Sequence, residues 1–201
     1  MASKYGFIDK SGKVVIEPQF DGASNFSEGF ACVEKDGKWG FIDKSGKVVV
    51  EPQFDGVGDF SEGLAEVEKD GKYGFIDKNG KVVIEPQFDN VSAFSEGLGG
   101  VEIDGKWGFI DKSGKMVIEP QFDWVRDFSE GLAQLFKDGK WGFIDKSGKV
   151  VIEPQFDDEI DIAGSFIAGL ACVRKDGKEG FIDKIGKVVI EPLPIYNYAA
   201  G

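Results

Sequence analysis

Acidic side chains are the groups in this chain that come nearest to what catalysis requires. The sequence holds 36 aspartates and glutamates and no histidine. Adjacent carboxylates such as Asp157 and Asp158 could in principle act as a general acid–base pair, as could Glu159 with Asp161. Such a pair also needs a cleft and shifted pKa values. Both pairs fall in a stretch that lengthens one copy of an internal repeat, so we interpret the stretch as a solvated loop.

The tetrapeptide Asp-Lys-Ser-Gly, as at Asp43 to Gly46, is the second candidate for chemistry. Calcium sites place several carboxylate and carbonyl oxygens around a glycine turn. The tetrapeptide offers too few acidic ligands, and the turn preferences of aspartate and glycine already account for it. The serine of the recurring Phe-Ser-Glu-Gly motif, such as Ser61, is interpreted as a turn former. We therefore expect no metal, no cofactor and no enzymatic activity.

Trp124 is the residue that most favours a binding role. It lies in a stretch of variable composition between two recurring motifs, Gln-Phe-Asp and Phe-Ser-Glu-Gly. Tryptophan and arginine are enriched among the residues that dominate protein interfaces. We predict that the stretch Trp124, Val125, Arg126 and Asp127 contacts a protein partner. The alternative is that Trp124 is a packing residue.

The other tryptophans suggest a rival function. A hairpin of the form Gly-Lys-Trp-Gly-Phe-Ile-Asp resembles in outline the choline-binding and glucan-binding repeats, whose exposed rings bind quaternary amines and sugars. Those repeats carry a denser aromatic triplet, whereas here a glycine separates Trp39 from Phe41. We prefer to place Trp39, Trp107 and Trp141 in the core between repeats. Binding of cell-wall carbohydrate or choline-type ligands is the alternative function.

The charge balance of the chain argues against two classes of partner. A formal net charge of −12 argues against a nucleic-acid partner, because binding to nucleic-acid phosphates relies on a basic patch. The same charge repels anionic lipid surfaces, and no apolar run approaches the roughly 20 residues that cross a bilayer. We expect neither nucleic acid nor membrane as a partner, and we expect a monomer.

Cysteine content and the first residues bear on the compartment. Cys32 and Cys172 are too few and too distant in sequence for a disulfide framework or a zinc cluster. Residues 1–6 lead directly into a repeat and leave no room for a signal peptide. A cytoplasmic location is the default expectation.

A motif of aromatic-Gly-Phe-Ile-Asp recurs through the chain at a fixed spacing. Its glycines are Gly6, Gly40, Gly74, Gly108, Gly142 and, without the aromatic residue, Gly180. The first five follow one another at steps of 34 residues and the last after 38, so a four-residue insertion lies near residues 157–165. We interpret residues 1–201 as a single domain of six repeat units with a modified C-terminal cap at residues 179–201.

Two turn signals divide each unit into three strands. In residues 64–88 the apolar alternation is interrupted at Asp70-Gly71 and at Lys78-Asn79-Gly80, which predicts a meander of two hairpins. For the first turn we prefer a three-residue loop, because it sets apolar residues opposite each other. The expected pairs are Glu68–Lys72, Val67–Tyr73, Ala65–Phe75, Asp77–Lys81, Ile76–Val82 and Phe75–Val83.

The predicted meander is apolar on both faces. One face carries Val67, Tyr73, Phe75 and Val83, and the other carries Leu64, Ile76, Val82 and Ile84. A sheet with one wet side would show polar residues at alternate positions, so each sheet is expected to be covered on both sides. A single copy should therefore not fold alone.

Glycine and proline mark two further positions in the unit. Gly74 lies mid-strand, where glycine indicates close approach of another backbone or of an aromatic ring, or alternatively a bulge. Pro86 follows a glutamate, as six of the seven prolines do, and is predicted to end the third strand. The stretch after this strand varies between copies, as at residues 22–25, 56–59, 90–93 and 124–127.

The recurring sequence KWGFIDKSGKVVVEPQFD, found at residues 38–55 and with variations in every other unit, resembles the WG-repeat or KWG-repeat family of bacteria. The resemblance covers nearly the whole chain. It implies an array of β-rich repeats and brings no catalytic residue with it. Tyr5 and Tyr73 keep an aromatic ring in place of the family's tryptophan, whereas Glu179 does not.

The last copy decides between two arrangements of the array. Terminal repeats are altered so that an outer face can meet water, and we interpret Glu179 as such a cap. The first copy lacks one strand, which only residues 194–199 could supply if the array closed. We therefore predict an all-β fold of three-stranded antiparallel meanders stacked into an open curved array. A closed propeller-like ring, which would bring Cys32 near Cys172, is the alternative.

Overall fold

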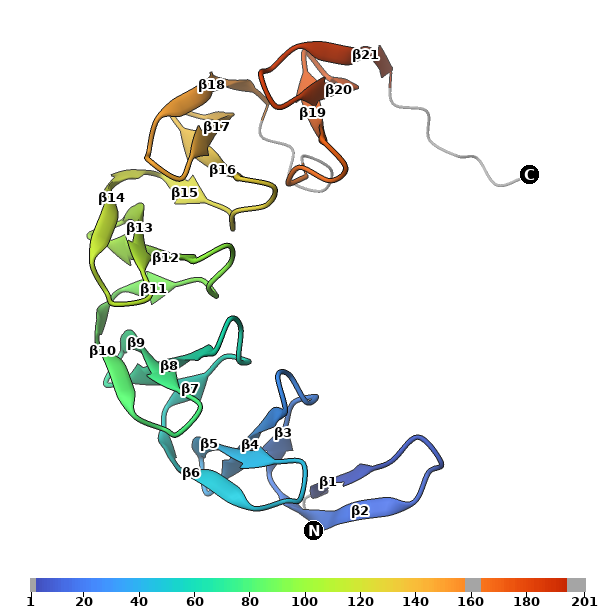
Figure 1. Ribbon diagram of the computed structural model, residues 1–201, viewed down its shortest axis with the longest axis vertical. Coiled ribbons are helices and arrows are strands. Elements are labelled where there is room, and N and C mark those ends of the chain that lie inside the picture. Colours follow the sequence, from blue (N-terminus) through green and yellow to red (C-terminus); the bar gives the residue numbers. More distant parts are fainter. Residues whose placement is uncertain (1–2, 158–163, 195–201) are drawn as a thin grey trace. The chain divides into compact units, whose positions relative to one another are not determined.

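The computed structural model of the chain describes residues 3–157 and 164–194 (Figure 1). All regular structure in these residues is β-strand, as the sequence predicts. They contain no helix, and hence none that is long and apolar enough to cross a membrane. Their strands form successive antiparallel sheets, none of which closes into a barrel.

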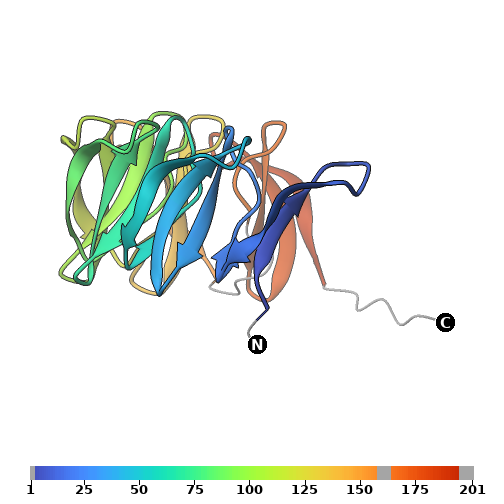
Figure 2. The same cartoon turned by 90° about the horizontal axis from the view of Figure 1, so that it is seen from below.

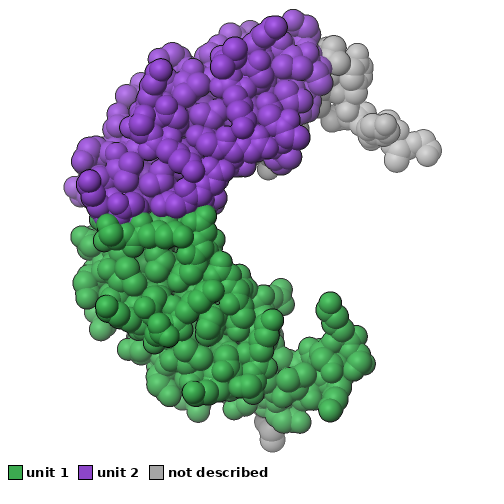
Figure 3. All heavy atoms as spheres, viewed as in Figure 1, with its two compact units in different colours: residues 1–94, 112–114 green, residues 95–111, 115–201 purple. Residues whose placement is uncertain are grey.

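The chain divides into two compact units (Figure 3). Unit 1 comprises residues 1–94 and 112–114, and unit 2 comprises residues 95–111 and 115–201. The short segment 112–114 belongs to unit 1 because Lys112 pairs with Glu62 at 3.0 Å and Gly114 lies over Ile84.

Unit 1 begins with a two-stranded sheet and continues with two four-stranded sheets. The first sheet consists of β1 (Tyr5–Ile8) and β2 (Val14–Phe20). The second consists of β3 (Gly22–Ala23), β4 (Phe30–Lys35), β5 (Lys38–Asp43) and β6 (Val48–Phe54). The third consists of β7 (Gly56–Val57), β8 (Leu64–Lys69), β9 (Lys72–Asp77) and β10 (Val82–Phe88), and β11 (Asn90–Val91) follows it.

Unit 2 repeats the same pattern. Its first three long strands are β12 (Leu98–Ile103), β13 (Lys106–Asp111) and β14 (Met116–Phe122). A four-stranded sheet follows, with β15 (Trp124–Val125), β16 (Leu132–Lys137), β17 (Lys140–Asp145) and β18 (Val150–Phe156). The last sheet consists of β19 (Leu170–Lys175), β20 (Lys178–Asp183) and β21 (Val188–Pro194).

Each four-stranded sheet is the predicted meander with one short strand added at its edge. The added strand comes from the variable stretch, which the sequence alone assigned to loops. In β7, Gly56 pairs with Glu68 and Val57 with Val67. Variable residues are thereby held in register beside the long strands.

The first hairpin turn has two residues, and the predicted three-residue register is wrong. Asp70 and Gly71 have φ angles of 52° and 74°. Two successive positive values are those of a type I′ turn, whose twist matches that of the flanking strands. This turn geometry outweighs the apolar pairing on which the prediction relied. The observed pairs are Lys69–Lys72, Glu68–Tyr73, Val67–Gly74, Glu66–Phe75, Ala65–Ile76 and Leu64–Asp77.

The second hairpin begins in the predicted register and then departs from it. The amide of Asp77 donates to the carbonyl of Lys81 at 2.9 Å, and Ile76 pairs with Val82 as expected. Beyond this point a bulge in β10 sets Ile84, and not Val83, opposite Phe75.

Gly74 and Pro86 explain the bulge together. A Cβ atom on Gly74 would lie 2.4 Å from the carbonyl oxygen of Ile84 and 2.6 Å from the nitrogen of Pro86. The expected close backbone approach is therefore confirmed, and it occurs at a bulge. Pro86 does not end the strand as predicted, since β10 continues to Phe88. Its missing N–H is tolerated at the bulge because the regular ladder is already interrupted there.

The middle long strands β5, β9, β13 and β17 bury side chains on both faces, as predicted. Phe75 and Ile76, which are consecutive and point to opposite faces, are 1% and 0% exposed. Sheets within a unit follow one another face to face (Figure 2), so the core lies between sheets. The composition of the faces differs from the prediction because the register differs, and Val83 is 38% exposed. One such core contains Cys32, Phe41, Val50, Phe54, Phe60, Ala65, Val67 and Ile76.

The Phe-Ser-Glu-Gly motif joins one repeat to the next. The hydroxyl of Ser61 donates to the carbonyl of Phe94 at 2.8 Å. The carboxylate of Glu28 accepts from the amide of Gly63 and pairs with Lys78, each at 3.0 Å. These bonds recur in unit 2, where Glu130 pairs with Lys184 at 3.1 Å. The motif is thus a connector as well as a turn.

Two predicted features fall partly outside the described residues. Of the insertion at residues 157–165, the segment 158–163 lies outside them, as do residues 195–201 of the predicted cap. The last sheet is described up to Pro194.

Candidate functional site

The sheet of β15–β18 differs from the others in one row of cross-strand neighbours. Trp124 pairs with Phe136, Phe136 with Trp141, and Trp141 with Phe156. The same row holds Gly22, Glu34, Trp39 and Phe54 in one sheet of unit 1 and Gly56, Glu68, Tyr73 and Phe88 in the other. Among the described four-stranded sheets, only β15–β18 has an aromatic residue at every position of this row.

Trp124 combines exposure with a fixed position. Its side chain is 47% exposed, while its ring packs against the ring of Trp107 with centroids 4.9 Å apart. Trp107 is 3% exposed and belongs to the core of unit 2. Because the Trp124 ring packs against a buried neighbour, little side-chain freedom remains to be lost when the ring contacts a partner.

Arg126 is held beside this row. Its amide donates to the carbonyl of Gln134 at 3.0 Å, and its guanidinium lies 5.5 Å from the centroid of the Trp141 ring. A cation above an indole ring is attracted by the negative face of the ring. Phe136 contacts the same ring, with centroids 5.0 Å apart. A guanidinium and two large rings are therefore brought together.

The other two residues of the predicted stretch have different surroundings. Val125 is 5% exposed and lies in the core with Phe128 and Leu135, so its side chain is not at the surface. Asp127 is exposed. We refer below to Trp124, Arg126 and Asp127 as the Trp124 surface.

The alternation of Trp124, Val125 and Arg126 between outside and inside follows from strand geometry, since successive side chains point to opposite faces. The prediction treated these residues as a loop and so placed all of them on one surface. Phe136 and Trp107 were missed, because their proximity to Trp124 depends on the short strand β15 pairing with β16 and on packing between sheets.

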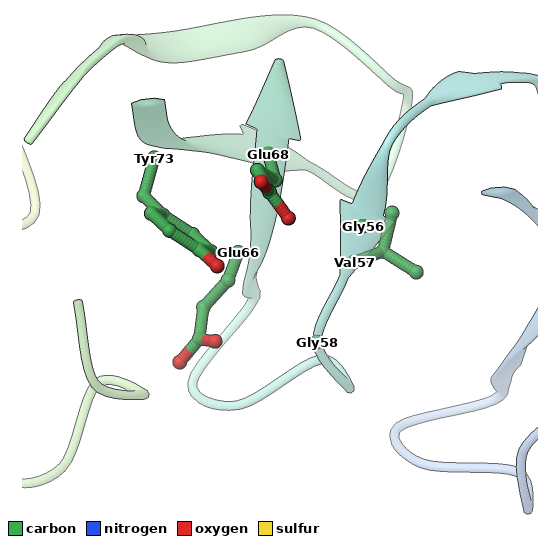
Figure 4. A pocket seen from close by; sticks show the side chains of 6 residues that line it. All are labelled: Gly56, Val57, Gly58, Glu66, Glu68 and Tyr73. Carbon is green, nitrogen blue, oxygen red and sulfur yellow. The ribbon is translucent and has the colours of Figure 1, made fainter. Parts of the chain in front are cut away.

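A pocket of about 140 Å³ occupies the corresponding place in unit 1 (Figure 4). It is lined by Gly56, Val57, Gly58, Glu66, Glu68 and Tyr73. A Cβ atom at Gly56 or Gly58 would lie 2.8 Å from a carboxylate oxygen of Glu68 or Glu66 respectively. The two glycines thus leave room for the two carboxylates.

Burial, together with the neighbouring Glu68 carboxylate, raises the pKa of Tyr73. The sequence did hold a signal for this pocket, namely two glycines in a variable stretch opposite alternate glutamates. It could be read only once the register was known.

In the last sheet the same row holds an ion pair. Arg174 is the cross-strand neighbour of Glu179, and its Nη2 lies 2.7 Å from the Glu179 Oε1. The side chains are 12% and 23% exposed. Glu179 stands at the position of the aromatic residue of the other repeats. Its carboxylate forms an ion pair with Arg174, so it is not simply a solvated side chain.

The turn aspartates use their carboxylates locally. Asp43 Oδ1 accepts hydrogen bonds from the Ser45 amide at 2.8 Å, the Ser45 hydroxyl at 2.6 Å and the Lys47 amide at 3.1 Å. The bond from the Ser45 hydroxyl is the main cause that lowers the pKa of Asp43. These bonds shape the Asp-Lys-Ser-Gly turn, as expected from its composition.

The sheets resemble those of several solved structures. Hsv2p of Kluyveromyces lactis matches with a TM-score of 0.59 at 12% identity. The match covers 85% of this chain and 64% of Hsv2p. A eukaryotic initiation factor matches with a TM-score of 0.58 at 12% identity. The match covers 92% of this chain and 61% of the initiation factor. This chain thus spans less than two thirds of either protein, and the likeness shows the fold alone.

Comparison with family models identifies the repeats themselves. No curated protein matches the chain. The model of the WG containing repeat matches residues 5–39, 39–73, 73–107, 107–141, 141–178 and 180–200. These six matches agree with the repeat units deduced from the spacing of the glycines. The chain therefore belongs to the family of WG-containing repeats.

Proposed function

We propose that the chain is a non-catalytic β-repeat scaffold that binds a protein partner through the Trp124 surface. The observation that carries the proposal is that Trp124 is 47% exposed although its ring is packed against Trp107. Large, immobile aromatic side chains provide contact area at a low cost in conformational entropy.

Arg126 and Asp127 complete the surface. Arginine is enriched in interfaces, and the cation–π contact with Trp141 holds its guanidinium near the exposed indole. The net charge of the chain is −12, which accelerates association with a partner of opposite charge. We therefore expect a partner that has an apolar pocket for Trp124 and a basic rim.

The non-catalytic part of the proposal is supported by the roles of the acidic groups. The carboxylates of Asp43 and Glu28 are engaged in a turn and in an ion pair, respectively. The hydrogen bond from Lys78 is the main cause that lowers the pKa of Glu28, which keeps it ionised. A general base instead needs a pKa near the working pH.

Carbohydrate or choline binding by exposed aromatics has less support. That function needs accessible rings, whereas Trp107 and Trp141 are 3% and 6% exposed and Trp39 is half-buried. Trp124 is the most exposed tryptophan among the described residues.

The test is a titration of a partner captured from a cell extract and then purified. Trp124→Ala should weaken binding by roughly thirtyfold or more, because loss of a hot-spot residue costs about 2 kcal/mol or more. Tyr5→Ala is the matched control, since Tyr5 is a 53% exposed aromatic residue outside the Trp124 surface. Equal affinities for the wild type and the Trp124→Ala variant would contradict the proposal.

A further inference from the structure

Successive sheets inside a unit share one recurring interface. The phenylalanine of one Gly-Phe-Ile-Asp motif and the isoleucine of the next enter the same buried cluster. Phe41 and Ile76 do so in unit 1, and Phe143 and Ile182 in unit 2, each at 1% exposure or less. We call the face with the phenylalanine the forward face and the face with the isoleucine the backward face.

The forward face of β19–β21 is largely uncovered. Phe181 is 38% exposed, whereas the equivalent Phe143 is 1% exposed. Ile190 is 46% exposed, whereas the equivalent Ile152 is 4% exposed. The apolar side chains that normally receive a following sheet are present in the last described sheet, but they face solvent.

The backward face of β1–β2 is uncovered in the same way. Ile8 is 67% exposed, whereas the equivalent Ile42 is 0% exposed. The exposed side chain is of the type that fills a forward face elsewhere in the chain.

A turn contact makes the two faces complementary. Gly46 lies over Ile16, so that an added Cβ atom would be 3.1 Å from its Cγ1, and Gly186 lies over Ile152 in the same way at 3.2 Å. Gly12 is the equivalent glycine of the first sheet, and no heavy atom comes within 4 Å of its Cβ position. Gly12 has no isoleucine beneath it, and Ile190 remains exposed among the described residues.

We propose that a second copy of this chain occupies the forward face of β19–β21. The backward face of its β1–β2 sheet packs there, with Ile8 against Phe181 and the Gly12 turn over Ile190. The contact continues the interface that already joins sheets within each unit. It is heterologous, because different surfaces of the two copies meet, and repetition of it builds chains of molecules.

Two elements of the internal interface are missing from this contact. The β1–β2 sheet has no counterpart, among the described residues, of the residues Phe60, Ala65 and Val67 that join Ile76 in the internal core. The second missing element is an ion pair. Lys78 pairs with Glu28 and Lys184 with Glu130, at 3.0 Å and 3.1 Å. Lys10 is the equivalent lysine in the β1–β2 sheet of the second copy, and the position of the first copy that would supply its glutamate holds Ala168. The association is therefore weaker than the internal interface, and the chain is monomeric when dilute.

The decisive experiment uses two blocked variants in sedimentation velocity. Ile8→Glu blocks the backward face and Phe181→Glu the forward face, and each variant alone should remain monomeric at concentrations where the wild type forms oligomers. An equal mixture should form 1:1 dimers and nothing larger, because each variant retains one free face. Val117→Glu, at a residue that is 39% exposed and in neither face, should associate like the wild type.

A gain-of-function variant tests the same contact independently of any loss of stability. Ala168 has a φ of 51°, close to the 53° of Glu130, so Ala168→Glu fits the backbone. The new glutamate should pair with Lys10 and tighten association by up to about fivefold, the range of an exposed ion pair. Adding Lys10→Ala should remove the gain.

Two outcomes would overturn the proposal. The first is that both the wild type and the Ala168→Glu variant remain monomeric at every concentration tested. This result would mean that another segment covers the two faces. The other is a mixture of the two blocked variants that contains only monomers. Neither outcome bears on the Trp124 surface.

Discussion

The ring of Trp124 lies against the ring of Trp107, with centroids 4.9 Å apart and planes inclined by 53°. Two indoles this close couple electronically, so the pair should give an exciton couplet in circular dichroism. Trp124→Ala should abolish the couplet and destabilise the fold by only about 1 kcal/mol, because the ring is half-exposed. Thermal unfolding measures the second effect. A wild-type spectrum without the couplet would contradict the pairing.

Gly74 should be the least replaceable glycine of its repeat. In Gly74→Ala the new methyl group would meet the backbone of Ile84 and Pro86, which cannot move without opening the bulge. We expect a loss of about 3 kcal/mol or more in the free energy of unfolding, measured in urea. Gly71→Asn is the matched control, since asparagine tolerates the positive φ of a type I′ turn. Similar losses for both variants would show that the close approach is absent.

The Glu28–Lys78 pair should make stability depend on pH. The hydrogen bond from Lys78 is the main cause that lowers the pKa of Glu28 from its ordinary 4.5. Because the folded-state value is the lower one, the stabilisation is full above about pH 4.5 and is lost as the pH falls through the folded value. At pH 7, Glu28→Gln should reduce the free energy of unfolding by less than about 1 kcal/mol, which appears as a slightly lower melting temperature. The difference should shrink at lower pH, and a constant difference would contradict the pairing.

The two cysteines should differ in reactivity. Burial raises the pKa of Cys32 to about 12, and this residue is 4% exposed, whereas Cys172 is only half-buried. The thiolate is the reactive form and requires access to solvent. In dilute native protein a maleimide should label Cys172 first, with mass spectrometry of peptides as the readout. Labelling of Cys32 should require unfolding, and equal rates at both residues would count against the described core.

The repeat, the three long strands of a unit and the burial of both faces of its middle strand could be predicted from the spacing of glycines and apolar residues. The register could not, because the apolar pairing of Val67 with Tyr73 and the turn preference of Asp70-Gly71 pointed to different loops. The turn prevailed. Pro86 was misread for a related reason, since a bulge is a property of two strands together and is not visible in one.

The candidate site was predictable in part. Trp124 stood out by composition, and the structure leaves it half-exposed. Val125 was included only because a loop was expected, whereas β15 turns its side chain into the core. Trp107 and Phe136 are far from Trp124 in sequence, and they join it through packing between sheets and through pairing in the observed register.

Hydroxyl-radical footprinting of the chain with its purified partner tests the proposed function most directly. Trp124 and Tyr5 are 47% and 53% exposed, so both should be oxidised readily in the free chain. In the complex, oxidation of Trp124 should fall severalfold while that of Tyr5 stays unchanged. Trp124 oxidised at the same rate in the free chain and in the complex would contradict the account.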